Sequence, residues 1–185
     1  TETKAPSNND ESVAKNACNV TRKFEARSFH PDLTGAAYLV ICEVQTVYIG
    51  TGEFGAAVLK FLAATEHRPA LIVSRPDQPS GRGRKLRPPP VARLAQELGI
   101  DLLQPEKLEQ QEVLDQIATV GSDLVCLSDY GALVREPLLT ERVILNVHPS
   151  LLPRWRGAAP IHHAIEAGDA ETGITIMQMD AGLDT

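Results

Sequence analysis

Cysteines, aromatic residues and long apolar runs are scarce in this sequence, and each absence excludes a class of protein. Three cysteines and one tryptophan occur among the 185 residues, and aromatic residues make up 4%. Cys18, Cys42 and Cys126 stand far apart and are odd in number, so they predict neither a disulfide framework nor a paired-cysteine metal or redox motif. We therefore expect a reducing compartment such as the cytoplasm, and no metal site.

No apolar segment reaches the roughly 20 residues that a membrane-spanning helix needs. Residues 1–43 differ from the rest: they begin with polar side chains and contain several acids, among them Glu2, Asp10 and Glu11. This composition matches neither a signal peptide, which has a compact apolar core, nor a transit peptide, which is poor in acids. We expect residues 1–43 to be an atypical, partly disordered extension, followed by one domain over residues 44–185.

The charge of the chain is unevenly placed. A net charge of −6 gives the whole chain no general attraction to polyanions. Between Arg75 and Arg93, however, six basic residues stand against the single acid Asp77. Glycine and proline are spaced around these cations, which is typical of a mobile arm that neutralises phosphates. The alternative is an ordinary solvated loop.

From residue 44 onward, hydrophobic periodicity predicts alternating strands and helices. Short continuous apolar runs indicate buried strands, and apolar residues three or four apart indicate helices. The expected strands are 44–49, 70–73, 101–103, 123–127, 143–147 and 173–179, and the expected helices are 53–64, 91–98, 109–120 and 160–167. This order predicts an α/β fold with a Rossmann-like, mostly parallel sheet and helices on both faces.

A glycine-rich turn, Gly50-x-Gly52-x-x-Gly55, joins the first expected strand to the first expected helix. This spacing matches the dinucleotide fingerprint, and Arg75 after the next strand would favour a 2′-phosphate, so an NADP-binding module is one hypothesis. The alternative is that the glycines only satisfy the backbone geometry of a tight turn. Glu53 favours this alternative, because its carboxylate would repel a pyrophosphate.

Asn146 and His148 stand at the end of the fifth expected strand. Residues two apart in a strand point to the same face, so both side chains are expected at the carboxyl edge of the sheet, where open α/β sheets bind ligands. An amide and an imidazole can together hold a carbonyl oxygen that becomes negative during acyl transfer. The loop that follows is bounded by prolines and carries Arg154, Trp155 and Arg156, which favours a functional site over a buried structural histidine.

Two segments carry a specific family resemblance: NVHPSLLPRWRGAAPI at residues 146–161 and TGITIMQMDAGLDT at residues 172–185. Together with GTGEF at residues 50–54, they resemble the folate-dependent formyltransferases over most of the chain. The resemblance implies the formyltransferase fold, with 10-formyltetrahydrofolate as the formyl donor and no metal ion. Gly52 replaces the proline usual in the family's opening motif, and Asp129 stands where the family has alanine before Tyr130.

The resemblance also implies roles for individual residues. Family members share an Asn, a His and an Asp as the catalytic set, which here fall on Asn146, His148 and Asp184. Asn146 and a protonated His148 would stabilise the oxyanion, and Asp184 would hold His148 in its charged form. The implied folate-binding residues are Leu127, Tyr130, Gly131, Leu133, Ser150, Leu151, Leu152, Pro153 and Asp180.

The basic segment resembles the long basic loop of those family members that act on tRNA. This likeness implies methionyl-tRNA as the partner, with the α-amine of the initiator form as the acceptor in translation initiation. The implied tRNA-binding residues are Arg82, Arg84, Lys85, Arg154 and Arg156. For the last two, pairing with nearby acids is the alternative.

Three functions are compatible with the sequence. They are formylation of methionyl-tRNA; a related reaction, either formylation of a sugar amine or hydrolysis of formylfolate; and NADP binding. The basic segment favours the first. The family continues past its last catalytic residue with more sheet and helix and then a β-barrel domain, so we expect residues 44–185 to be an incomplete catalytic domain. We expect a monomer without membrane contact.

Overall fold

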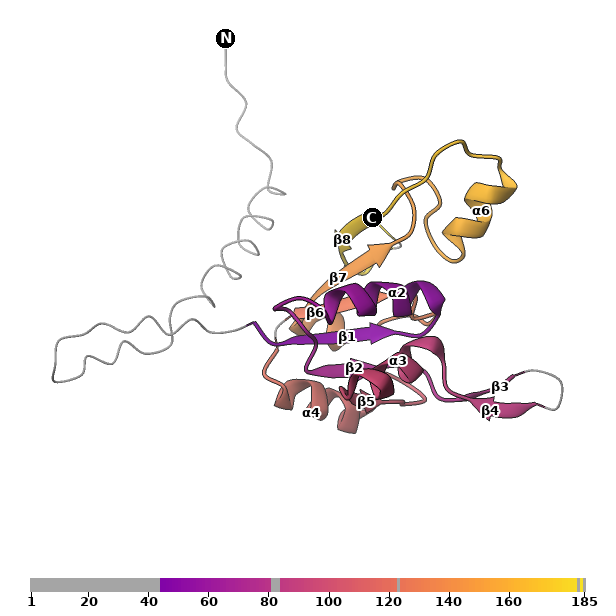
Figure 1. Ribbon diagram of the computed structural model, residues 1–185. Coiled ribbons are helices and arrows are strands. Elements are labelled where there is room, and N and C mark those ends of the chain that lie inside the picture. The colour runs from indigo at the N-terminus through magenta and orange to yellow at the C-terminus, as the bar shows by residue number, and fades with distance from the viewer. Residues whose placement is uncertain (1–43, 81–83, 123, 183, 185) are drawn as a thin grey trace, which may run out of the picture. The chain divides into compact units, whose positions relative to one another are not determined.

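The computed structural model describes residues 44–80, 84–122, 124–182 and 184 (Figure 1). The expected extension, residues 1–43, lies outside this range, so its disorder stays a prediction. Within the described residues, no helix is both long enough and apolar enough to cross a membrane.

A six-stranded sheet forms the centre of the unit 44–185, in the strand order β5-β2-β1-β6-β7-β8. Every pair of neighbours is parallel except β7 and β8, which are antiparallel. The predicted mostly parallel sheet is therefore confirmed, and all six predicted strands are present with small shifts at their ends. Their bounds are β1 (Thr46–Gly50), β2 (Leu71–Val73), β5 (Asp101–Leu103), β6 (Leu124–Ser128), β7 (Val143–His148) and β8 (Thr175–Gln178).

Helices cover both faces of the sheet, as predicted. On one face, Leu59 of α2 (Glu53–Leu62) and Val91 of α3 (Pro90–Leu98) pack on Tyr48 of β1. On the other face, α4 (Gln111–Thr119) and α5 (Leu138–Glu141) pack on alternate residues of β1, β2, β6 and β7. Each fully buried aliphatic side chain stabilises the fold by about 1.5–3 kcal/mol. The four-residue α5 was not predicted, because it is too short to show a helical period. The predicted last helix is α6 (Pro160–Glu166).

The order of the strands reverses between β1 and β6. The chain first builds outward from β1 to β2 and β5, and then returns to place β6 beside β1 and β7 beside β6. Because these strands are parallel, the carboxyl ends of β1, β6 and β7 lie at one edge of the sheet. Such a reversal is where open α/β sheets bind ligands.

The basic segment forms a β-hairpin that projects from the sheet (Figure 1). β3 (Gln78–Ser80) and β4 (Lys85–Arg87) pair antiparallel in a separate two-stranded sheet. The sequence predicted a loop here, because residues 78–80 and 85–87 are mostly polar or charged and contain no apolar run. We refer to β3 and β4, together with Arg84 directly before β4, as the basic hairpin.

The glycine-rich turn after β1 is closed by Asp129, which follows β6. The backbone oxygen of Asp129 accepts hydrogen bonds from the N–H groups of Thr51 (3.0 Å) and Gly52 (3.2 Å), and its carboxylate accepts one from Gly55 N–H (3.4 Å). A Cβ atom on Gly52 would overlap this carboxylate. The glycine spacing thus serves the close approach of Asp129, and amide donors that a dinucleotide phosphate would need are already engaged. This geometry weighs against the NADP hypothesis.

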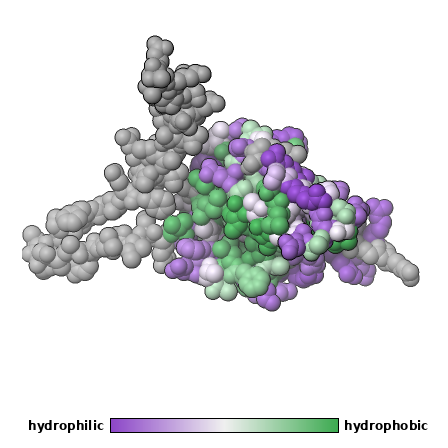
Figure 2. All heavy atoms as spheres, turned by 90° about the horizontal axis from the view of Figure 1, so that it is seen from above, coloured by the Kyte–Doolittle hydropathy of each residue, from purple (hydrophilic) through white to green (hydrophobic). Residues whose placement is uncertain are grey.

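Large apolar side chains remain exposed on the described part of the chain. Figure 2 shows an extended hydrophobic area bordered by hydrophilic residues on one face. A contiguous apolar area of this kind is typical of a surface that contacts another protein or another part of a longer chain. The exposed large hydrophobic residues are Val44, Phe61, Leu86, Leu133, Leu151, Ile161, Ile165, Ile174 and Ile176.

The contact between Gly52 and Asp129 gives a test by double substitution. Gly52→Ala is expected to lower the free energy of unfolding by about 1–3 kcal/mol, because the new methyl group overlaps the Asp129 carboxylate. Asp129→Gly removes that carboxylate and suits the positive φ of 51° at this position. In the double variant most of the loss caused by Gly52→Ala should therefore disappear, as measured by urea denaturation of all four proteins.

Gly55→Ala is the matched control for this cycle. Its Cβ would lie 2.8 Å from the backbone oxygen of Ser128, which Asp129→Gly does not move. The loss caused by Gly55→Ala should therefore persist in the Asp129→Gly background. Strictly additive effects of Gly52→Ala and Asp129→Gly would contradict the proposed overlap.

Candidate active site

Asn146 and His148 lie on the same face of β7, as their spacing predicts. Ile144, Asn146 and His148 are buried, whereas the residues between them are half-buried. Asn146 is 8% exposed and His148 is 5% exposed. Because these polar groups sit at the carboxyl edge on the face that bears the larger core cluster, they form a largely desolvated pair of hydrogen-bonding side chains.

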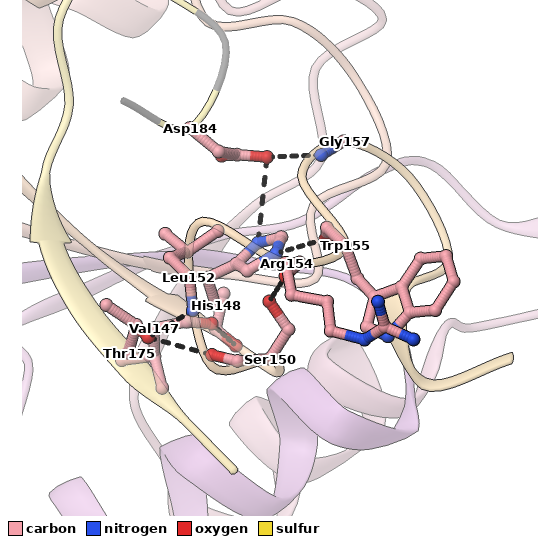
Figure 3. A network of polar contacts seen from close by, with 10 residues as sticks. Val147, His148, Ser150, Leu152, Arg154, Trp155, Gly157, Thr175 and Asp184 are labelled. Carbon is pink, nitrogen blue, oxygen red and sulfur yellow. Dashed lines mark hydrogen bonds and ion pairs between the residues drawn. The ribbon is translucent and has the colours of Figure 1, made fainter. Parts of the chain in front are cut away.

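Both ring nitrogens of His148 face protein oxygens (Figure 3). Nε2 lies 3.0 Å from the backbone oxygen of Trp155, and Nδ1 lies 3.8 Å from Oδ2 of Asp184. A carbonyl can only accept, so Nε2 must carry a hydrogen and donate it to Trp155. The contact with Asp184 is longer than a hydrogen bond and is an ion pair when the ring is protonated. Nδ1 is therefore the nitrogen left to meet a substrate.

Asp184 reaches His148 through a turn after β8. Because β8 runs antiparallel to β7, it leads the chain away from the carboxyl edge, and a turn must bring it back. Asp180 Oδ1 accepts a hydrogen bond from Gly182 N–H at 2.6 Å inside this turn. Asp184 Oδ2 then accepts a hydrogen bond from Gly157 N–H at 2.6 Å. The structure thus brings Asn146, His148 and Asp184 to one edge, and it gives Asp180, expected to bind folate, a place in the turn.

Internal hydrogen bonds shape the loop after β7. Ser150 Oγ donates to the backbone oxygen of Arg154 (2.7 Å). Thr175 Oγ1 donates to the Ser150 oxygen (2.8 Å) and accepts from Leu152 N–H (3.2 Å), which ties the loop to β8. The buried Ser150, expected as a folate contact, therefore uses its side chain within the protein.

The other expected folate-binding residues divide into two groups. Leu127 and Tyr130 are buried in the core, and burial raises the pKa of the Tyr130 phenol while nearby Arg75 partly opposes this. The second group is at least partly accessible beside the carboxyl edge, and the folate contacts stay a prediction. It consists of the exposed Gly131, Leu133, Leu151 and Pro153 and the half-buried Leu152.

The expected tRNA-binding residues also differ from one another. Arg84 and Lys85 are exposed on the basic hairpin, and Arg82 lies outside the described residues. Arg156 is exposed on the loop after β7. Arg154 instead forms a two-point ion pair with Asp169, through Nε (2.8 Å) and Nη2 (2.6 Å). For Arg154, the structure thus shows the pairing with a nearby acid that was the alternative expectation.

Sequence reasoning missed several groups that surround His148. The backbone oxygen of Trp155 and the N–H of Gly157 leave no signal in a sequence, because these groups do not depend on the side chain. Asp169 follows α6 and reads as an ordinary surface acid, yet it accepts hydrogen bonds from Arg154 and from Trp155 Nε1 (2.6 Å). Asp169 lies 14 residues after Trp155, and no sequence pattern links an acid at that distance to Arg154 and Trp155.

Other reactive side chains contribute little to this site. Burial raises the pKa of the Cys126 thiol to about 11, so the thiolate that would act as a nucleophile is scarce at neutral pH. Over the residues that the structure describes, no three His, Cys, Asp or Glu side chains are grouped to hold a metal ion.

A mostly parallel, Rossmann-like α/β sheet thus carries an amide, an imidazole and a carboxylate at its carboxyl edge, where such sheets bind ligands. The chain belongs to the formyl transferase family, whose sequence profile matches residues 44–185. This result confirms the resemblance seen in the sequence.

Individual relatives agree with this family. The chain is 48% identical to the methionyl-tRNA formyltransferase of Neisseria meningitidis over 145 residues, which are 77% of this chain and 47% of that protein. It is 49% identical to the enzyme of the same name from Chromobacterium violaceum, with the same coverage. The chain thus spans about half the length of these relatives. Its fold resembles the solved phosphoribosylglycinamide formyltransferase of Streptococcus pneumoniae, with a TM-score of 0.60, 26% identity and 77% of each chain covered.

The Asp169 carboxyl is expected to stay ionised at pH values well below the ordinary pKa of an aspartate side chain. Hydrogen bonds from Arg154 and then Trp155 lower its pKa from 3.8 to about 2. A lowered pKa in the folded state means that ionised Asp169 stabilises the fold above about pH 4, and that this contribution is lost as the pH falls towards 2. A carbon-13 NMR titration of the carboxyl should show this midpoint. The stability gap between the protein and Asp169→Asn, measured by urea denaturation, should narrow over the same pH range. A midpoint near 4 would contradict the ion pair.

Proposed function

We propose that this protein transfers the formyl group of 10-formyltetrahydrofolate to the α-amine of initiator methionyl-tRNA, in the cytoplasm and as a monomer. The observation that carries the proposal is the setting of His148, whose Nε2 donates to Trp155 while its Nδ1 faces Asp184 beside Asn146. Similarity to two methionyl-tRNA formyltransferases supports the choice of acceptor.

The reaction needs donors for an oxygen that becomes negative. The amine nitrogen attacks the formyl carbon, a C–N bond forms, and the carbonyl oxygen takes up the electron pair. In this proposal the Asn146 amide and the Nδ1–H of a protonated His148 donate to that oxygen. Each donor of this kind contributes roughly 10²–10³ in rate, because it is already oriented in a site shielded from water. Collapse of the intermediate breaks the bond between the formyl carbon and the folate nitrogen.

Protons must also move, because the attacking amine loses one and the folate nitrogen gains one. Asp184 is the carboxylate at the site, and Gly157 N–H fixes its Oδ2. Its other oxygen remains to accept the amine proton through water, while Oδ2 balances the charge of the imidazolium. His148 and Asp184 therefore both orient the reacting groups and take part in proton transfer.

The basic hairpin supplies the proposed contact with tRNA. Arg84, Lys85 and Arg87 are exposed on it, in a chain whose net charge is −6. A local basic arm on an acidic protein binds a polyanion at one place and leaves the rest of the surface without affinity. Arg156 adds a cation on the loop beside the active site.

The choice of acceptor is tested with the full reading frame that contains these 185 residues. The protein is incubated with 10-formyltetrahydrofolate and one of three acceptors: methionyl-tRNA, an amino sugar nucleotide, or water alone. We expect formyl-methionyl-tRNA as the product and no turnover above background with the other two. Formylation of the sugar alone, or release of formate alone, would overturn the proposal and favour a related enzyme.

His148→Ala is the matched variant for this assay. It should lower kcat by about 10²-fold or more while the folate affinity, measured by fluorescence titration, stays nearly unchanged. His67→Ala, which removes an exposed imidazole from the loop before β2, should leave both values unchanged. Equal kcat values for the protein and His148→Ala would remove the proposed role of this residue.

The basic hairpin makes a separate prediction about salt. Arg84→Ala and Lys85→Ala should each raise the KM for tRNA and reduce the slope of log affinity against log salt by about 0.7–0.9, because each residue neutralises one phosphate. Lys60→Ala removes an exposed lysine from the last turn of α2 and should leave the slope unchanged. Unchanged slopes in both hairpin variants would exclude this contact.

A further inference from the structure

The carboxylate of Asp169 collects three hydrogen bonds from two adjacent residues of the loop after β7. Arg154 donates from Nε (2.8 Å) and Nη2 (2.6 Å), and the indole Nε1 of Trp155 donates over 2.6 Å. Asp169 is itself fixed to the end of α6, because its N–H donates to the Ala164 oxygen at 3.0 Å. Its side chain is only 16% exposed. Asp169 is therefore a fixed acceptor to which the loop is attached.

The Trp155 ring also contacts the side chains of Arg154 and His163. The guanidinium carbon of Arg154 lies 4.3 Å from the ring centroid, and the His163 ring stacks at 5.7 Å with an interplanar angle of 24°. Cation–π and stacked aromatic contacts both stabilise a ring in a defined orientation. Together with the bond to Asp169, they hold the indole in place.

The backbone of Trp155 needs this support. Its φ of 63° lies in the left-handed region, which is unfavourable for a large side chain and persists only where the surroundings hold it. In this conformation the Trp155 oxygen meets Nε2 of His148 at 3.0 Å. The side-chain contacts of Trp155 therefore maintain the backbone position that orients the imidazole.

The same short stretch controls the other side of His148. Two residues after Trp155, the N–H of Gly157 holds Oδ2 of Asp184, which faces Nδ1 of the ring. Figure 3 shows Trp155, His148, Asp184 and Gly157 joined in this way. A displacement of residues 155–157 would thus move both oxygens that flank the imidazole.

We propose that Asp169 is a positioning residue for His148. With Arg154, it holds residues 155–157 so that Trp155 keeps the hydrogen on Nε2 and Nδ1 stays available for the reaction. The inference rests on the proposed formyl transfer and adds to it two residues that do not touch the reacting atoms. It also assigns Arg154 a role different from the tRNA contact expected from the sequence, and leaves Arg156 as the tRNA-facing cation of this loop.

The first experiment measures the tautomer of the His148 imidazole. Nitrogen-15 NMR of the full reading frame that contains this chain, without substrates, reports which ring nitrogen of His148 carries hydrogen when the ring is neutral. We expect hydrogen on Nε2 in the parent protein. Asp169→Ala should yield a mixture of both tautomers, and Asp169→Asn, which keeps one acceptor oxygen, should yield a smaller change.

The second experiment separates positioning from binding. Asp169→Ala is expected to lower kcat by about tenfold or more with the KM for folate unchanged, because a small displacement of a catalytic group slows the reaction without weakening binding. Arg154→Lys should likewise lower kcat with the KM for folate unchanged. It should leave the salt dependence of tRNA binding unchanged. Arg156→Ala should instead reduce that salt dependence.

Glu171→Gln is the matched control, since it neutralises an exposed acid two positions away. It should change neither the NMR signals nor kcat. If Asp169→Ala does not fold, Asp169→Asn and Arg154→Lys carry the same comparison.

The inference is overturned if these variants keep the parent tautomer and the parent kcat, or if Arg154→Lys changes the salt dependence alone. Because the NMR measurement uses no substrate, it stands even if methionyl-tRNA proves not to be the acceptor.

Discussion

A backbone carbonyl has no hydrogen to give, and this constraint decides which ring nitrogen of His148 carries a hydrogen. Once Nε2 is bonded to Trp155, the tautomer is fixed and Nδ1 is directed toward Asp184. The orientation of the ring and the availability of its other nitrogen both depend on this contact. The carboxylate opposite Nδ1 is held separately, by the N–H of Gly157.

The sheet brings the three polar side chains together by two different routes. Asn146 and His148 share a strand, so the two-residue repeat of β structure is enough to align them. Asp184 follows β8, the antiparallel strand at the edge of the sheet, and the turn at Asp180 brings the chain back towards His148. The strand itself therefore fixes Asn146 and His148 relative to each other, whereas the position of the Asp184 carboxylate depends on the hydrogen bond from Gly157.

Much of the fold could be predicted because it depends on regular repeats. The buried parallel strands leave continuous apolar runs and the edge strand β8 alternates, so all six strands were found. The hairpin β3–β4 contains no apolar run, and the helix α5 is too short to show a helical period. For the site, the spacing of Asn146 and His148 was sufficient. The contacts of Asp169 could not be predicted, because they are made by a loop whose backbone is left-handed at Trp155, and no residue type signals that conformation there.

The turn after β1 shows how a chain can supply its own anion. Asp129 places a negative oxygen at the amino end of α2, where the helix dipole attracts it and where related α/β proteins receive a phosphate from outside. Glycine spacing at such a turn therefore indicates space for a hydrogen-bond acceptor. It does not show whether that acceptor belongs to a ligand or to the protein itself. In sequences of this kind, a carboxylate on the residue that follows the neighbouring strand can occupy the position of a nucleotide phosphate.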